Sequence, residues 1–399
     1  LIAQLARADP DRWREVVILS GGIHALPDPG PVWVLLKALT DREDTETLTE
    51  PDAWGLRLAG EILAESVALS DLNPKRQKIF NRIQHILPEA LTTPHLAARE
   101  RVDIGCFLGK IGDPRAAVTD VDAMPFCHVP AGPFFMGKGA YDNENEVWLL
   151  VEETPAGEYD LKYDYWIAQY PVTVAQFQMF VDDSGFELGD TDALKAGSNT
   201  PVVWVSQQEA LAFCDWLTRR WQQAGVLPEG WRVTLPNEPE WEKAARGGLD
   251  IPATPLVNSI ATIAFEKPVA RPVMKSNHES QRRYPWGNLI DDSYANYQMN
   301  VGGVSTPGIY FGSISPYGCH DLAGNVWEWT RSERGDYPYP AIGTHEYQQR
   351  ENGNPVVCVL RGGAFDGYRS RVRCAVRHGG RPVDRDDDVG FRVVLSPCR

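Results

Sequence analysis

The chain has 399 residues and a formal net charge of −15, with 54 acidic against 39 basic side chains. This excess of negative charge repels nucleic acids and anionic membrane surfaces, so we expect neither among the partners. No apolar run approaches the roughly 20 residues that span a bilayer, and we therefore expect a soluble, cytoplasmic protein.

The cysteines are spread widely along the chain. They are Cys106, Cys127, Cys214, Cys319, Cys358, Cys374 and Cys398. Their number is odd, and they form neither a CxxC pair nor the dense pattern of a disulfide-stabilised domain. A chemically reduced interior is the simplest interpretation.

Residues 1–118 show the apolar periodicity of helices. Asp9, Pro10 and Asp11 predict the start of a first helix, and Gly21 and Gly22 predict its end. Similar patterns cover residues 31–39, 54–69, 75–86 and 95–111. We expect an all-α helical-repeat domain here, and because helical pattern begins at once, we expect the chain to start inside a longer natural protein.

The end of this helical part carries a resemblance of its own. Residues 99–118 read RERVDIGCFLGKIGDPRAAV, which resembles the HEAT-like unit that ends the sensor part of bacterial NACHT-type signalling ATPases. The resemblance implies that the partners include other domains of a longer signalling chain. A plain helical adaptor is the alternative, and no glycine loop ending in GK[ST] is present to bind a nucleotide.

The composition changes at Met124, where helix formers give way to Trp, Tyr, Gly and Pro. An ordered series of blocks then follows: CHVPAGPFFMGKG, YDYWIAQYPVTVAQFQMFV, PVVWVSQQEALAFCDWL, WRVTLPNEPEWEKAARGG, YPWGN, SPYGCHDLAGNVWEWT and RGGAFDG. This series resembles the formylglycine-generating enzyme and sulfatase-modifying-factor family. The resemblance covers roughly residues 124–396. It implies that residues 124–399 form an α+β domain with a C-type-lectin-like fold: a small twisted antiparallel sheet, two main helices and long loops.

Local signals agree with those helices. Thr173 is placed to cap a helix that carries Phe177 and Phe180 on one face. Ser206, with Glu209 three residues later, predicts a capping box at the start of a second helix. A third, short helix is expected to begin near Pro236. Residues 142–162 are rich in Asp and Glu and are expected to form a solvated loop, with a cation site as the lesser alternative.

The segment DLAGNVWEW suggests a metal. Carboxylates at Asp321 and Glu328, with the main-chain carbonyls of Gly324 and Val326 between them, provide the hard oxygen ligands that Ca²⁺ prefers. In the family this pattern holds a structural calcium, so the resemblance implies one here. The alternative is that the two tryptophans of this segment are core and the two acids cap a turn.

The resemblance also implies which chemistry is missing. The copper-dependent oxidases of the family use two active-site thiols shortly after the RGG turn. The first position falls here on Gly367 and the second within residues 369–372, where no cysteine occurs, whereas Cys374 matches a framework cysteine. Since soft-metal ligation and thiol redox chemistry need thiolates, we expect no enzyme, and a copper-dependent formylglycine-generating oxidase or a related enzyme is the alternative.

Residues 360–394, here called the variable region, combine framework with irregular positions. RGG opens the region, and VGFRVV closes it as a β-rich run. The frame resembles that of proteins diversified by a retroelement, in which copying of adenines replaces residues encoded by asparagine codons, and Asn is absent from residues 360–399. The resemblance implies ligand contacts at the positions between the framework blocks: Phe365, Asp366, Gly367, Tyr368, Ser370, Arg371, Val376, His378, Gly379, Gly380, Val383, Asp386, Asp387 and Asp388.

We therefore expect a recognition protein that binds a protein or another macromolecule, as the sensor part of a larger signalling protein. Phe365 and Tyr368 are expected to be aromatic anchors. Arginines between residues 369 and 385 give the variable region local positive charge, although some are expected to pair with its aspartates. A cation site at Asp386, Asp387 and Asp388 is the lesser alternative.

Overall fold

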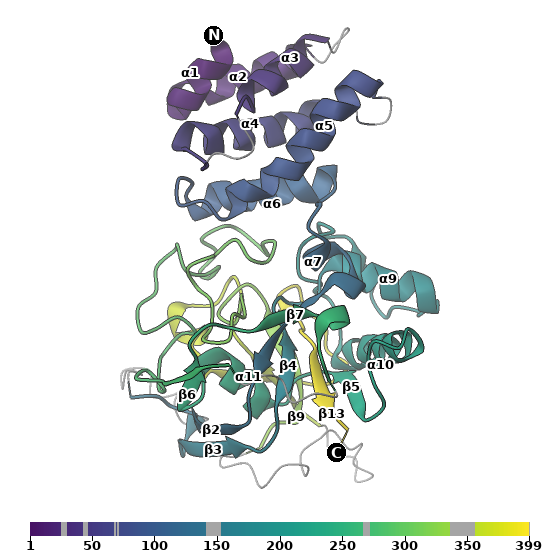
Figure 1. The fold of residues 1–399 in the computed structure, drawn as a ribbon, viewed down its shortest axis with the longest axis vertical. Helices are drawn as coiled ribbons and strands as arrows, with labels where there is room; N and C mark the ends of the chain where they lie inside the picture. The colour runs from purple at the N-terminus through teal and green to yellow at the C-terminus, as the bar shows by residue number, and fades with distance from the viewer. Residues whose placement is uncertain are drawn as a thin grey trace. The chain divides into compact units, whose positions relative to one another are not determined.

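The computed structural model describes residues 1–24, 30–42, 47–67, 69, 72–140, 153–265, 272–335 and 356–398 (Figure 1). Contacts divide these residues into two compact units. The N-terminal unit comprises residues 1–119 with 197–199, and the C-terminal unit comprises residues 120–196 and 200–399. That each part folds as an independent domain stays a prediction. No described helix is long and apolar enough to cross a membrane.

The described secondary structure of the N-terminal unit is helical. Its elements are α1 (Ile2–Ala8), α2 (Pro10–His24), α3 (Gly30–Leu39), α4 (Glu50–Ser66), α5 (Pro74–Ile86), η1 (Leu87–Leu91), α6 (Ala98–Ile111) and α7 (Ala116–Thr119). The expectation that Gly21 and Gly22 end a helix is wrong, because α2 continues through them. A Cβ at Gly21 would lie 3.1 Å from the side chain of Ile62, so glycine here allows α2 to pack closely on α4.

The helices of the C-terminal unit begin where their caps predict. They are α9 (Val174–Ser184), α10 (Gln207–Gln223) and the short α11 (Glu238–Arg246). Thr173 and Ser206 each form a capping box with the residue three positions on, Gln176 and Glu209. Each box pairs main-chain N–H groups at the helix start with side-chain oxygens, which is why these local sequence signals were sufficient.

Two larger sheets organise the unit. Strands β1 (Pro125–Val129), β4 (Tyr165–Ala168), β5 (Trp231–Thr234), β7 (Val257–Ser259) and β13 (Val394–Pro397) form an antiparallel sheet in the order β5-β13-β4-β1-β7. Strands β9 (Trp327–Glu333), β10 (Cys358–Arg361), β11 (Arg377–Gly380) and β12 (Val389–Gly390) form a second sheet in the order β11-β10-β9-β12. The pair β9 and β12 is parallel, so the sheets are not wholly antiparallel as expected.

Shorter elements are also present in the described part of the unit. Strands β2 (Gly132–Met136) and β3 (Gly157–Leu161) pair with each other, as do β6 (Asp250–Pro252) and β8 (Met274–Ser276). The single-turn helices are η2 (Val121–Ala123), η5 (Thr191–Leu194), η6 (Ile260–Thr262) and η7 (Arg369–Arg371). The remaining described chain forms long loops, as the sequence predicts.

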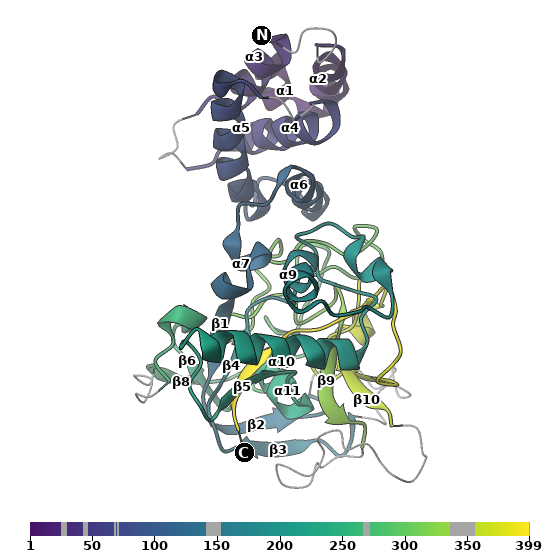
Figure 2. The ribbon, with the colours of Figure 1, turned by 90° about the vertical axis from the view of Figure 1, so that its right-hand side faces the viewer.

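An aromatic core joins the helices to the C-terminal strands. The ring of Phe213 on α10 lies 5.9 Å from that of Phe177 on α9 and 5.4 Å from that of Phe391. Helix α10 packs against β5 and β9 (Figure 2). Burial of such rings is the main driving force for folding, and it places Phe391 of the closing VGFR segment at the centre of the unit.

Buried ion pairs fasten β10 and β11 to α11. Arg361 donates to Glu238 at 3.2 Å and to Glu242 at 2.5 Å, and Arg377 donates to the two oxygens of Glu238 at 2.7 and 2.8 Å. The Arg361 guanidinium also lies 5.2 Å from the ring centre of Trp241. Buried charges require partners, so these pairs help to determine where the two strands lie.

The described end of the acidic segment 142–162 is not the solvated loop that the sequence predicts. Residues 141–152 lie outside the described residues, and β3 occupies the end of the segment. Between them, Glu153 is 1% exposed and accepts two hydrogen bonds from Arg373 at 2.7 and 2.9 Å. Glu153 is therefore a structural counter-ion for the variable region, 220 residues away in sequence.

Candidate ligand-binding pocket

A cavity of about 520 Å³ lies where the variable region meets β9. It is lined by Trp327, Trp329, Leu360, Asp366, Gly367, Tyr368, Arg371, His378, Gly379, Gly380, Asp384, Arg385, Asp386, Asp388 and Val389. Small-molecule and cofactor sites typically occupy about 300–1,000 Å³. The cavity, here called the pocket, is therefore large enough for a side chain or a small molecule.

Most of the predicted ligand-binding residues line the pocket. These are Asp366, Gly367, Tyr368, Arg371, His378, Gly379, Gly380, Asp386 and Asp388. Phe365, Ser370, Val383 and Asp387 are at least partly exposed but do not line it. Val376 is 1% exposed and belongs to the hydrophobic core, so its placement among ligand contacts is corrected: it is a framework residue.

Strand β9 contributes pocket residues that were not predicted from the sequence. Trp327 and Trp329 come from the NVWEWT block, where alternate residues share one face of the strand. Antiparallel pairing sets Leu360 opposite Trp329, and parallel pairing sets Val389 opposite Trp327. The alternation was visible in the sequence, but the pairing that brings β9 beside residues 360 and 389 was not.

The main chain of the variable region is held by groups outside it. Phe365 N–H donates to the Asn325 carbonyl at 3.1 Å, and the Phe365 carbonyl accepts from Met299 N–H at 2.7 Å. Further on, the Asp386 carbonyl accepts from Trp204 N–H at 2.9 Å, and the Asp388 carbonyl accepts from Trp327 N–H at 2.8 Å. These bonds use backbone atoms alone and would survive a change of the side chains at positions 365, 386 and 388.

The opening glycines of the variable region are conformational requirements. Gly362 and Gly363 have φ of +97° and +75°, a region that residues with a Cβ adopt at a cost. Gly379 and Gly380 are constrained differently, by space. A Cβ at Gly379 would lie 2.6 Å from Val357, and one at Gly380 would lie 2.7 Å from the Trp329 ring. Both glycines line the pocket, but they cannot accept larger side chains without displacing these neighbours.

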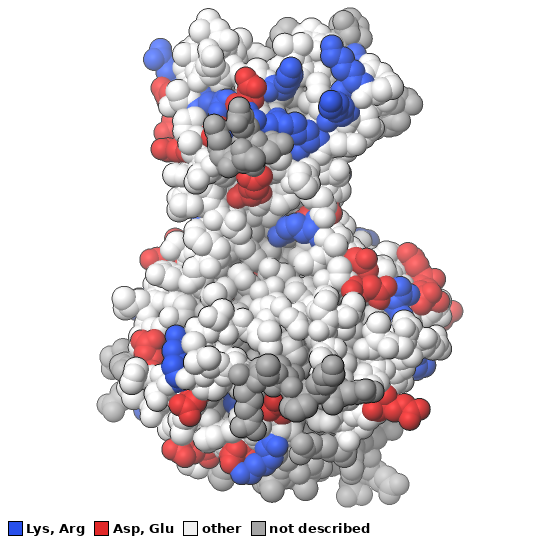
Figure 3. Space-filling view, in the orientation of Figure 1, with Lys and Arg blue, Asp and Glu red and all other residues white. Residues whose placement is uncertain are grey.

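The positive charge expected of the variable region is largely neutralised. Arg373 pairs with Glu153, Arg377 with Glu238, Arg381 with Asp384 and Arg385 with Glu209. On the face of the C-terminal unit that Figure 3 shows, acidic and basic side chains are interspersed. The expectation of a locally positive surface is therefore corrected, because most of these guanidinium groups already hold carboxylates.

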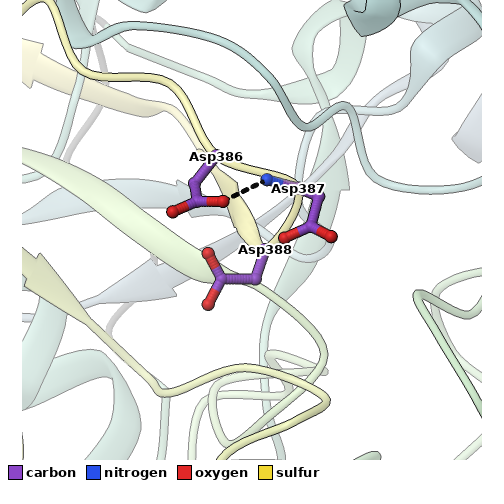
Figure 4. Close-up of side chains that lie close together, drawn as sticks. All are labelled: Asp386, Asp387 and Asp388. Atoms are coloured by element: carbon purple, nitrogen blue, oxygen red, sulfur yellow. Dashed lines mark hydrogen bonds between the residues drawn. The ribbon is translucent and has the colours of Figure 1, made fainter.

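Acidic side chains dominate the charge of the pocket instead. Asp386, Asp387 and Asp388 present carboxylate oxygens within 4.8 Å of one another, and the main-chain N–H of Asp387 donates to Asp386 (Figure 4). Burial, with the nearby carboxylates of Asp366 and Asp386, raises the pKa of Asp388 to about 7. Among the residues that the structure describes, no cationic side chain forms an ion pair with Asp366, Asp386 or Asp388.

The segment expected to bind calcium is committed to other partners. Glu328 is fully buried and accepts from Arg392 through both oxygens, at 2.6 and 2.7 Å, and from the Trp241 indole N–H at 2.7 Å. Asp321 accepts from Gly308 N–H at 3.0 Å, and the Gly324 carbonyl accepts from Val326 N–H at 3.0 Å.

These residues do not fit the calcium site that the sequence predicts. The Arg392 cation already supplies the positive charge that Glu328 requires, and a second cation beside it would be repelled. No part of the proposed function depends on calcium at Asp321, Gly324, Val326 and Glu328.

None of the seven cysteines lines the pocket. Gly367, at the position where the oxidases carry their first thiol, lines it without one. Cys374 is fully buried, and burial raises the pKa of its thiol to about 12. A thiol that stays protonated in the core is neither a soft-metal ligand nor a redox nucleophile.

Comparisons with known proteins place the C-terminal part in a family. A model described as "Sulfatase-modifying factor enzyme 1-like domain" matches residues 114–397. The chain is 26% identical over 335 residues to inactive C-alpha-formylglycine-generating enzyme 2 of Mus musculus, covering 72% of this chain and 90% of that protein. It is also 26% identical over 302 residues to hercynine oxygenase of Mycolicibacterium smegmatis, covering 66% and 60%.

Other matches are partial or remote. A match to serine/threonine-protein kinase pkn1 of Chlamydia caviae, 26% identical over 260 residues, covers 60% of this chain but only 34% of the kinase. The solved structure of Treponema denticola variable protein 1 aligns with a TM-score of 0.45 at 20% identity, over 68% of this chain and 95% of that one.

The family match supports the expectations for the C-terminal part and not those for the N-terminal part. Residues before 114 lie outside it, and the resemblance of the N-terminal unit to NACHT-type proteins has no support here. The predicted α+β fold of the C-terminal part is confirmed. Since the family model matches residues 114–397, more than half of the chain, the protein belongs to the sulfatase-modifying factor enzyme 1-like family.

Proposed function

We propose that the protein recognises a ligand through the pocket and that a retroelement diversifies the side chains that line this pocket. In this proposal the chain is the sensor part of a larger signalling protein. The observation that carries this proposal is the separation of two roles within the variable region. Its main chain is anchored to residues such as Asn325, Trp204 and Trp327 by backbone bonds, whereas Asp366, Tyr368 and Asp386 expose side chains at the pocket.

This separation suits a recognition site. Exposed substitutions usually change stability by less than about 0.5 kcal/mol, so side chains at these positions can vary while the fold persists. Tyr368 is 68% exposed at the pocket, a rigid aromatic group of the kind that binding sites use as anchors. The buried pairs of Arg361, Arg373 and Arg377 meanwhile maintain the frame.

The alternative is an enzyme, and the names of the relatives include both possibilities. The mouse relative is named inactive, whereas hercynine oxygenase is named for an activity. The residues favour the first, because no thiol lines the pocket. A chain that binds stoichiometric copper and oxidises a cysteine-containing peptide would overturn the proposal.

Two experiments test the proposal directly. Sequencing the DNA downstream of the gene should reveal a near-copy of codons 360–394 that differs only at adenines. The absence of this copy would contradict diversification by a retroelement. Replacing Asp366, Tyr368 and Asp386 together by alanine should leave the melting temperature nearly unchanged, because these side chains are exposed and the Asp386 carboxylate accepts from the main chain of its neighbour Asp387, not from a distant part of the frame. Unfolding of this triple variant would contradict the separation of roles.

A further inference from the structure

If the pocket binds a ligand, as proposed above, the charges that line it constrain the chemistry of that ligand. Two of the charged groups that line the pocket have partners of opposite charge: Arg385 donates to Glu209 at 2.9 Å, and Asp384 accepts from Arg381 at 2.9 Å. These pairs leave Asp366, Asp386 and Asp388 as pocket carboxylates that no described cation neutralises.

The carboxylates are close enough to disfavour the ionisation of one another. Burial favours the protonated form of Asp388, and the charges of Asp366, Asp386 and Asp387 add to this effect. A positive group placed among them would replace repulsion with attraction. Arg371 and His378 also line the pocket, so the positive group would have to lie nearer to the carboxylates than to these two side chains.

Aromatic rings and volume provide a second, independent observation. Trp327, Trp329 and Tyr368 line the same cavity, and the Trp327 ring lies 5.4 Å from the His378 ring. Aromatic faces attract guanidinium and ammonium groups. A bare metal ion uses oxygen ligands at about 2.0–2.6 Å and would leave most of the 520 Å³ unfilled.

We infer that the ligand inserts an organic cation, a guanidinium or ammonium group, among Asp366, Asp386 and Asp388, against the aromatic wall of the pocket. A basic side chain of a protein partner and a small free amine share this chemistry. Both combine a compact positive charge with an apolar stem that the rings can cover.

The test selects random linear peptides, displayed on phage, against the full chain. Bound peptides are then measured on the double variant D386N/D388N, which removes both ionisable carboxyl groups with little change of shape. D192N is the control, because Asp192 is a partly exposed aspartate that pairs with Lys195 and does not line the pocket. We expect peptides with an essential Lys or Arg, a rise in Kd of about tenfold or more in D386N/D388N, and a change below about twofold in D192N.

The two proposals fail differently. Peptides that lose binding in Tyr368→Ala but need no basic residue and tolerate D386N/D388N would overturn the cation inference and leave the pocket as a binding site. Selection that yields no peptide sensitive to Tyr368→Ala or to D386N/D388N would overturn the proposed function as well.

Competition identifies the source of the cation. Displacement of a selected peptide by agmatine, a small guanidinium compound, would show that a small free cation is sufficient to occupy the pocket. Dependence on the peptide without displacement by agmatine supports a basic side chain within a protein partner. Displacement by calcium chloride at matched ionic strength, with one calcium bound in calorimetry, would identify a metal site and overturn the inference.

Discussion

The buried pair of Glu328 and Arg392 gives the sharpest test of how the frame is held. Both side chains are fully buried, and Arg392 also donates to the carbonyls of Ala168 at 3.1 Å and His320 at 2.9 Å. Glu328→Gln removes the negative charge while nearly keeping the shape. The guanidinium would then remain buried without its counter-ion.

The expected cost follows from that burial. Breaking a buried ion pair by removing one partner typically destabilises a protein by about 3–5 kcal/mol. We expect the free energy of unfolding of the C-terminal unit to fall by about this amount, measured by urea denaturation with intrinsic tryptophan fluorescence. Asp384→Asn, which removes one charge from an exposed pair, should cost less than about 1 kcal/mol.

Two results would refute the reasoning. A loss below about 1 kcal/mol in Glu328→Gln would mean that Arg392 does not depend on this carboxylate. An effect of EDTA on the free energy of unfolding would refute the reasoning in another way. If the chelator destabilised the native chain and not the variant, calcium would stabilise the segment that contains Asp321 and Glu328. We expect EDTA to change neither protein.

Three further predictions concern the pocket. A cationic peptide favours the ionised form of Asp388, whose pKa is raised to about 7, so the affinity of the peptide should increase as pH rises toward that value. Calorimetry should show this trend flattened in Asp388→Asn, and an unchanged trend would assign the pH dependence to another group. The raised pKa also means that ionising Asp388 costs stability, so Asp388→Asn should reduce the loss of unfolding free energy as pH rises through about 7. Gly380→Ala should destabilise the fold by about 1–3 kcal/mol in urea denaturation, because its Cβ would lie 2.7 Å from the Trp329 ring, whereas Gly303→Ala, with open space around it, should be neutral; equal effects would contradict the packing argument.

Local interactions were readable from the sequence. The helices at Thr173 and Ser206 begin where predicted because a capping box depends on residues three positions apart. The ordered aromatic and glycine blocks were sufficient to identify the family and the α+β fold of the C-terminal part. Positions 366–368 and 386–388 were predicted as ligand contacts because they break the periodicity of the framework on either side, and that they bind a ligand stays a prediction.

What only the tertiary structure decided depends on contacts between distant residues. Arg373 meets Glu153 across 220 positions, and Arg377 meets Glu238 across 139, so the sequence could not show which arginines stay available to a ligand. Strand pairing brings Trp327 and Trp329 into the pocket, and core packing removes Val376 from it. The sign of the pocket's charge follows from these pairings, because opposite charges cancel according to their distance in space and not their order along the chain.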